Sequence, residues 1–150
     1  MNKIKQQLYN QCFTFIENRL LTVKKTINEI QESLTSETKS SAGDKHETGR
    51  AMLQLEREKA GNQLAEIIKV KEALSKISVE NTSQTIGLGS VVYTNNANYY
   101  IAISAGEIHI NKEKFYAISP NTPIGKLVIG KTVSTKLSFR EQEIEIVAVI

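Results

Sequence analysis

An uninterrupted heptad pattern near the start of the chain constrains the fold more than any other feature. No Gly or Pro occurs between Lys3 and Leu34, and the apolar residues there follow spacings of 4, 3, 4, 3 and 4: Ile16, Leu20, Val23, Ile27, Ile30 and Leu34. This spacing places them on one side of an α-helix, with mostly polar residues on the other sides. A stripe of this kind must be covered, so it predicts a long helix packed against a second one.

A second helical pattern follows at residues 53–77. Its apolar residues recur at spacings of 3, 4 or 7, with Val70 nearby: Leu53, Ala60, Leu64, Ile67, Leu74 and Ile77. Gly61 is the one weak point, because Gly costs about 1 kcal/mol relative to Ala inside a helix. The intervening segment is rich in Ser, Thr and Gly, which predicts a turn between Thr35 and Thr48. We therefore expect an antiparallel helical hairpin from about Lys3 to Ile77.

The pattern changes after Ser78. The polar stretch "SVENTSQTIG" predicts a linker, and six short β-rich runs follow, from "GSVVYTN" to "EIEIVAVI". Pro123, in "TPIGKLVIG", suits the first turn of a helix. The predicted fold class is α+β: a coiled-coil hairpin at residues 1–78, a linker at 79–86, and a small, mostly antiparallel β-rich domain with one short helix at 87–150.

Composition excludes several classes of protein. There is no Trp, aromatic residues make up 6% of the chain, and Cys12 is the single cysteine, so an internal disulfide and a multi-cysteine zinc site are ruled out. The net charge of +3 is too small to predict tight nucleic-acid binding, which requires clustered phosphate contacts. The sequence shows neither a signal peptide nor a membrane-spanning run, so we expect a cytoplasmic protein that does not bind membranes.

Two acidic residues three positions apart, Asp44 and Glu47, occupy the predicted turn. One interpretation is structural, because Asp44 can cap the second helix and Glu47 can complete a capping box. The other is functional, because two carboxylates at the end of a long hairpin could be delivered to a distant site. The sequence leaves both interpretations open, and they are compatible with each other. We find no catalytic triad, metal quartet or nucleotide-binding motif, so an activity intrinsic to this chain is not expected.

The C-terminal half resembles the bacterial Gre transcript-cleavage factors. In "ISPNTPIGKLVIGKTV", residues 118–133, a Ser-Pro pair is followed by two apolar-Gly-Lys steps, which is similar to the signature of that family. The runs "GSVVYT" and "EIEIVAVI" resemble the family's opening and closing strands. The hairpin tip matches less well. The family has Gly-Asp-Leu-Ser-Glu-Asn-Ala-Glu-Tyr, and this chain keeps Gly43, Asp44 and Glu47 but has Lys45, His46 and Arg50 in place of Leu, Ser and Glu.

The resemblance implies a function. Gre factors bind core RNA polymerase, insert the hairpin into its secondary channel and stimulate cleavage of backtracked RNA by the polymerase active site, near the RNA 3′ end. Their C-terminal domain is FKBP-like. By resemblance, Asp44 and Glu47 assist that active site and share its Mg²⁺, no cofactor is intrinsic to the chain, and a monomer is expected. The resemblance also implies a polymerase-docking surface made by eight residues: Ser119, Pro120, Pro123, Ile124, Gly125, Lys126, Gly130 and Lys131.

Two alternatives remain at this point. Lys45 and Arg50 lie beside the acidic residues and compete with Mg²⁺, so the protein could occupy the channel and modulate transcription without cleavage. A coiled-coil adaptor with an unrelated protein partner is the second alternative. A peptidyl-prolyl isomerase is disfavoured, because such a site needs an aromatic pocket and the chain has only four Phe and five Tyr. His109 alternates with two isoleucines in a strand, so we expect it to face solvent.

Overall fold

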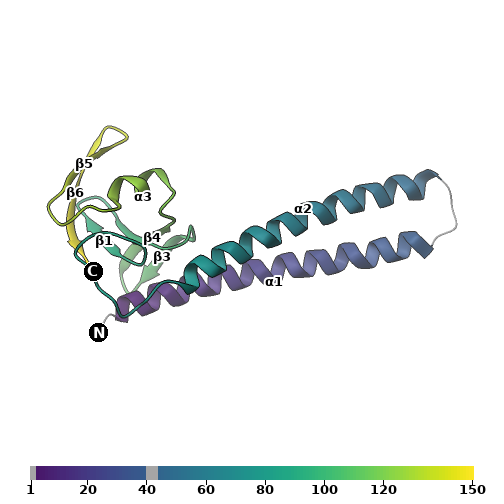
Figure 1. Ribbon diagram of the computed structural model, residues 1–150, viewed down its shortest axis with the longest axis horizontal. Coiled ribbons are helices and arrows are strands. Elements are labelled where there is room, and N and C mark those ends of the chain that lie inside the picture. The colour runs from purple at the N-terminus through teal and green to yellow at the C-terminus, as the bar shows by residue number, and fades with distance from the viewer. Residues whose placement is uncertain (1–2, 40–43) are drawn as a thin grey trace. The chain divides into compact units, whose positions relative to one another are not determined.

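The computed structural model describes residues 3–39 and 44–150, with the backbone alone at 37–39 and 44–47 (Figure 1). The chain forms two compact units, which we describe separately. The hairpin unit is Ile16–Lys71, and the sheet unit combines Met1–Phe15 with Glu72–Ile150. The first turns of the first helix therefore group with the C-terminal half of the sequence. The division into a hairpin at residues 1–78, a linker at 79–86 and a β-rich domain at 87–150 stays a prediction.

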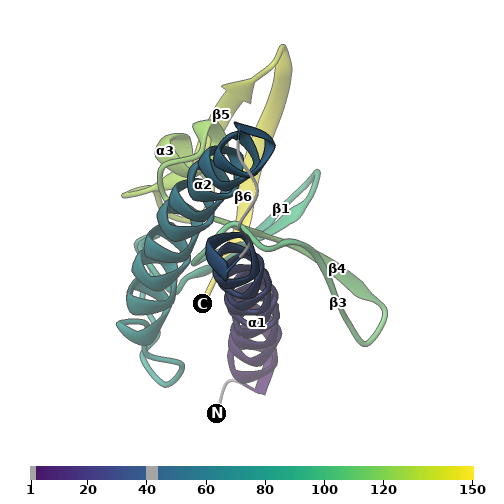
Figure 2. The same cartoon turned by 90° about the vertical axis from the view of Figure 1, so that its right-hand side faces the viewer.

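The hairpin unit consists of two antiparallel helices that lie side by side (Figures 1 and 2). They belong to α1 (Lys3–Lys39) and α2 (Asp44–Ser75). The predicted seam is confirmed, since its residues in this unit are all buried or half-buried: Ile16, Leu20, Val23, Ile27, Ile30, Leu34, Leu53, Ala60, Leu64, Ile67 and Val70. An ion pair also joins the helices, with Lys71 Nζ 2.5 Å from Glu17 Oε1.

The predicted turn between Thr35 and Thr48 is too long. Helix α1 continues to Lys39 and α2 already begins at Asp44. The reason is physical, because Ser and Thr cost a helix well under 1 kcal/mol each relative to Ala, and no Gly or Pro stops α1 in this segment. The Thr35 hydroxyl finds a partner within the helix by donating to the Gln31 carbonyl at 3.0 Å. The part of the predicted turn at residues 40–43 lies outside the described residues.

The sheet unit contains one six-stranded sheet with the order β3-β4-β2-β1-β6-β5. All six predicted strands are confirmed: β1 (Val91–Thr94), β2 (Asn98–Ile101), β3 (Gly106–Ile110), β4 (Glu113–Ile118), β5 (Lys136–Phe139) and β6 (Gln142–Val149). The sheet is mixed, because β2 and β4 pair in parallel while the other four pairings are antiparallel. The chain leaves β2, forms β3 at the edge and returns along β4, so β3 and β4 make a hairpin at one edge of the sheet (Figure 2).

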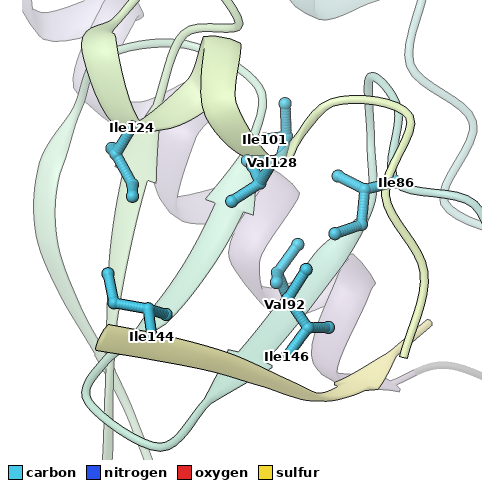
Figure 3. Packing of buried hydrophobic residues seen from close by; sticks show 7 residues of the cluster. All are labelled: Ile86, Val92, Ile101, Ile124, Val128, Ile144 and Ile146. Carbon is cyan, nitrogen blue, oxygen red and sulfur yellow. The ribbon is translucent and has the colours of Figure 1, made fainter. Parts of the chain in front are cut away.

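Both faces of the sheet centre are buried. On one face, α3 (Pro123–Val128) packs Ile124 and Val128 against the strands, in a cluster completed by Ile86, Val92, Ile101, Ile144 and Ile146 (Figure 3). On the other face, the fully buried Tyr100 lies near Tyr9 and Cys12 of α1. The start of α1 thus belongs to the sheet core, which explains why Met1–Phe15 groups with this unit.

Cys12 is a core residue of the sheet unit. Its side chain is fully buried, and burial raises the pKa of the thiol to about 12. A thiol with so high a pKa carries almost no thiolate at neutral pH, so it is a poor nucleophile.

None of the helices in the described residues carries an apolar stretch long enough to cross a bilayer.

Tyr100 supplies a test of the packing on this face. Its hydroxyl is buried and finds no hydrogen-bond partner among the described residues. A buried polar group without a partner costs about 1–3 kcal/mol, so Tyr100→Phe should raise the free energy of unfolding by about 1 kcal/mol or more. Urea denaturation measures the change. A loss of stability in Tyr100→Phe would show instead that the hydroxyl is satisfied in the folded protein.

Candidate functional site

The predicted tip acids lie at the start of α2. Asp44 is its first residue and Glu47 its fourth, so both belong to the first turn of the helix. Their side chains lie outside the described residues, as does Gly43, so the acid pair stays a prediction. Arg50 is exposed three positions beyond Glu47. A carboxylate in the first turn is favoured by the helix dipole whatever its further role.

No intrinsic metal site is visible in the part of the chain that the structure describes. Among the described side chains, no three His, Cys, Asp or Glu residues come together in a way that could hold a metal ion. His109 is exposed at the edge of the sheet, as predicted, with Nε2 3.8 Å from Glu107 Oε1.

The segment that resembles the Gre signature folds around a helix cap. Thr122 caps α3, and its Oγ1 accepts a hydrogen bond from the Gly125 N–H at 3.1 Å. The same hydroxyl donates to the Ser119 carbonyl at 2.8 Å. Pro123 opens the helix, as the sequence predicts. This cap joins the Ser-Pro loop to the first turn of α3.

Several of the eight predicted docking residues are needed for the local fold around α3. Ile124 is a member of the core cluster and Gly125 is buried. A Cβ atom at Gly125 would lie 2.5 Å from the Ser119 carbonyl oxygen, closer than van der Waals contact allows. Gly130 has a φ of 81°, a left-handed conformation that Gly adopts readily. Its N–H donates to the Ile86 carbonyl at 2.8 Å, which ties the predicted linker to the end of α3.

The remaining residues form an outward surface at α3 and the loop after it. Ser119 and Pro120 are half-buried, whereas Pro123, Lys126, Gly130 and Lys131 are exposed. Two exposed apolar residues, Ile129 and Val133, join them and were not predicted from sequence. We call the exposed set the α3 surface: Pro123, Lys126, Ile129, Gly130, Lys131 and Val133. Two lysines beside two apolar side chains are suited to a mildly acidic protein partner.

An open cavity of about 520 Å³ near the β1–β2 turn was not predicted. The Tyr99 and Tyr116 rings contribute to it, with their centroids 6.2 Å apart. Lys114 also lines it, but its ammonium lies 2.9 Å from Glu107 Oε1, and that carboxylate raises the lysine pKa. The positive charge is thus already paired, which makes the cavity a weak candidate for an anion. Parallel pairing of β2 with β4 sets Tyr99 opposite Tyr116, a neighbourhood that the sequence does not reveal.

No protein-family model and no curated protein matches the chain. Among solved structures, the chain is similar to the transcription factor Gfh1, with 20% sequence identity over 89% of this chain and 90% of that one, at a TM-score of 0.35. A superposition this loose carries no functional argument, so the following proposal is based on the residues of this chain.

Proposed function

We propose that this protein is a Gre-type elongation factor that binds core RNA polymerase, inserts its hairpin tip into the secondary channel and stimulates cleavage of backtracked RNA. In this proposal the polymerase performs the chemistry and the chain has no catalytic site of its own. Two features support the proposal: the segment around α3 resembles the Gre signature, and the chain combines a helical hairpin with a sheet unit. A cytoplasmic location is part of the same proposal.

The observation that carries the proposal is the position of Asp44 and Glu47. They stand in the first turn of α2, at the closed end of the hairpin unit. At 1.5 Å per residue, the 28 helical residues from Asp44 to Lys71 extend roughly 40 Å. In the proposed function, two carboxylates at the end of so long a helix would reach into the channel.

The chemistry of the acid pair fits the proposed task. Mg²⁺ prefers oxygen ligands and is typically held by one or two carboxylates together with waters and substrate phosphate. In phosphodiester cleavage, a second metal ion stabilises the attacking and leaving oxygens. Asp44 and Glu47 would help to hold that ion, which belongs to the polymerase active centre, next to the RNA 3′ end.

The α3 surface is proposed to dock on the polymerase. Lys126→Glu and Lys131→Glu should each weaken binding to core RNA polymerase by about tenfold, because reversing a charge in a complementary interface introduces repulsion. Binding is measured by titrating labelled protein with core enzyme. Lys112→Glu, an exposed lysine in the turn between β3 and β4, is the matched control and should bind as wild type does. Equal affinities for all four proteins would place the docking surface elsewhere.

A channel-occupying regulator is the second candidate. The residue that favours it is Arg50, which is exposed and replaces the family's second Glu, with Lys45 as a further positive charge. Both lower the negative potential on which Mg²⁺ binding depends. The two candidates share polymerase binding and differ only in cleavage. A coiled-coil adaptor, by contrast, would not retain core polymerase in a pull-down.

A further inference from the structure

A second cavity, of about 200 Å³, lies in the sheet unit where the predicted linker passes the start of α1. Two lysines and several hydroxyl side chains contribute to it: Lys5, Lys76, Ser78, Thr82, Ser83 and Ser90. No acidic side chain lines it. This composition distinguishes it from the cavity near the β1–β2 turn, where the Glu107 carboxylate already pairs with Lys114.

Lys5 is the unusual member of this lining. Only 3% of the residue is exposed, and its Nζ donates one hydrogen bond to the Asn81 carbonyl at 2.7 Å. Among the described residues no carboxylate pairs with it, and burial lowers its pKa. An ammonium has three donors, so two remain for another partner. A buried charge without a counter-charge is costly, which makes an anionic partner favourable.

The hydroxyl groups are oriented by backbone donors. Ser78 Oγ accepts from the N–H groups of Glu80 and Asn81, each at 3.3 Å. In the same way, Ser83 Oγ accepts from Thr85 N–H at 3.2 Å and Ser90 Oγ from Gly87 N–H at 3.0 Å. A hydroxyl that accepts in this way still has its own proton to donate. Within the described residues these three protons find no acceptor, so they are available to a ligand.

We propose that this cavity binds an oxyanion of the phosphate class. Lys5 supplies the buried charge, the exposed Lys76 adds a second charge at the rim, and the serine hydroxyls donate to the anion's oxygens. The volume is several times the ~30 Å³ that a water molecule occupies in the liquid, which is enough for a phosphate group and too little for a nucleoside as well. The site is independent of the polymerase proposal, and its occupation would fasten the start of α1 to residues 78–90.

The test uses the full chain and inorganic phosphate. Titration followed by calorimetry and by the thermal unfolding temperature, at constant ionic strength set with chloride, should show saturable binding and a matching rise in Tm. Lys5→Met keeps the length of the side chain and should abolish both responses, even if removal of the buried charge itself raises Tm. Ser83→Ala and Lys76→Gln act at exposed positions and should weaken phosphate binding several-fold without loss of folding, whereas Lys112→Gln should bind as wild type does.

The outcomes separate the possible ligands. Adenosine monophosphate should bind no more tightly than inorganic phosphate if the phosphate group alone is recognised. Tight binding of the nucleotide without binding of inorganic phosphate would overturn the assignment. So would a phosphate response that survives in Lys5→Met, or a wild-type response no larger than that to chloride, since Lys5 would then be only a structural tie to Asn81.

Discussion

Replacing Gly125 by alanine is expected to lower the free energy of unfolding of the sheet unit by about 2–3 kcal/mol, because a new methyl group must be fitted into a closed contact. That methyl group would lie 2.5 Å from the Ser119 carbonyl oxygen and 2.8 Å from Thr122 Oγ1. Both atoms belong to the cap that starts α3, so relief of the clash has to shift the helix or break the cap. Urea unfolding followed by circular dichroism gives the change.

Gly87→Ala is the matched control for this experiment. Apart from its two chain neighbours, a Cβ atom at Gly87 would meet no heavy atom within 4 Å, so this variant should differ from wild type by less than about 0.5 kcal/mol. The difference in unfolding free energy between the two variants measures the cost of the close contact at Gly125, separately from the general effect of Gly→Ala on the unfolded chain. If both variants unfold at the same urea concentration, the tight contact between α3 and the Ser-Pro loop is not present in solution.

Removing the tip charges is expected to have the largest effect on activity. Asp44→Asn and Glu47→Gln keep the shape of each side chain but remove the charge that, in the proposed function, would help to hold Mg²⁺. Each should slow transcript cleavage by on the order of 100-fold, because charge stabilisation by a metal ion is worth several kcal/mol. The rate of RNA shortening in stalled polymerase complexes measures this effect, and polymerase affinity should stay unchanged.

A purely structural role for the acids gives a different pattern. If the acids only cap α2, Asn and Gln keep most of that capping, so these variants would change stability by well under about 1 kcal/mol and leave cleavage nearly intact. The converse variants Lys45→Leu and Arg50→Glu, which restore the residues of the resembling family, should accelerate cleavage if the neighbouring positive charge weakens the metal contact. Faster cleavage in these two variants, together with slower cleavage in the first two, would separate metal delivery from capping.

The type of each helix and strand, and their order along the chain, could be predicted because each element has a strong local pattern. The heptad seam predicted two helices, and the residues from Ile16 to Val70 on that seam are buried or half-buried. Pro123 predicted the start of α3, and six β-rich runs predicted six strands. These features depend on residue spacing within one element, which a single sequence displays directly.

Features that depend on contacts between distant segments were missed. Nothing in the sequence shows that β2 pairs with β4 in parallel, so the Tyr99–Tyr116 neighbourhood was not foreseen. The packing of Tyr9 and Cys12 near Tyr100 was missed for the same reason. Lys5 did leave a signal, because it lies three residues before Leu8, and Leu8 and Cys12 follow at helical spacing on the buried side of α1. A lysine on an apolar stripe indicates a buried charge that needs a partner.

The candidate site was predicted only in part. In the signature-like segment, sequence similarity does not separate residues that build the loop from residues that face outward. The structure makes that separation: Ile124 and Gly125 are buried, whereas Lys126 and Lys131 are exposed. Docking experiments should therefore be directed at the two lysines, and stability experiments at Gly125.

Transcript cleavage by wild-type protein tests the central proposal most directly. RNA polymerase is stalled in a backtracked complex with 5′-labelled RNA, and Mg²⁺ is supplied with and without the protein. The proposal predicts that the protein binds the complex and shortens the RNA from its 3′ end much faster than the polymerase does alone. RNA that stays intact while the protein is bound and transcription slows would contradict cleavage and favour the channel-occupying regulator, and failure to bind core polymerase would contradict both.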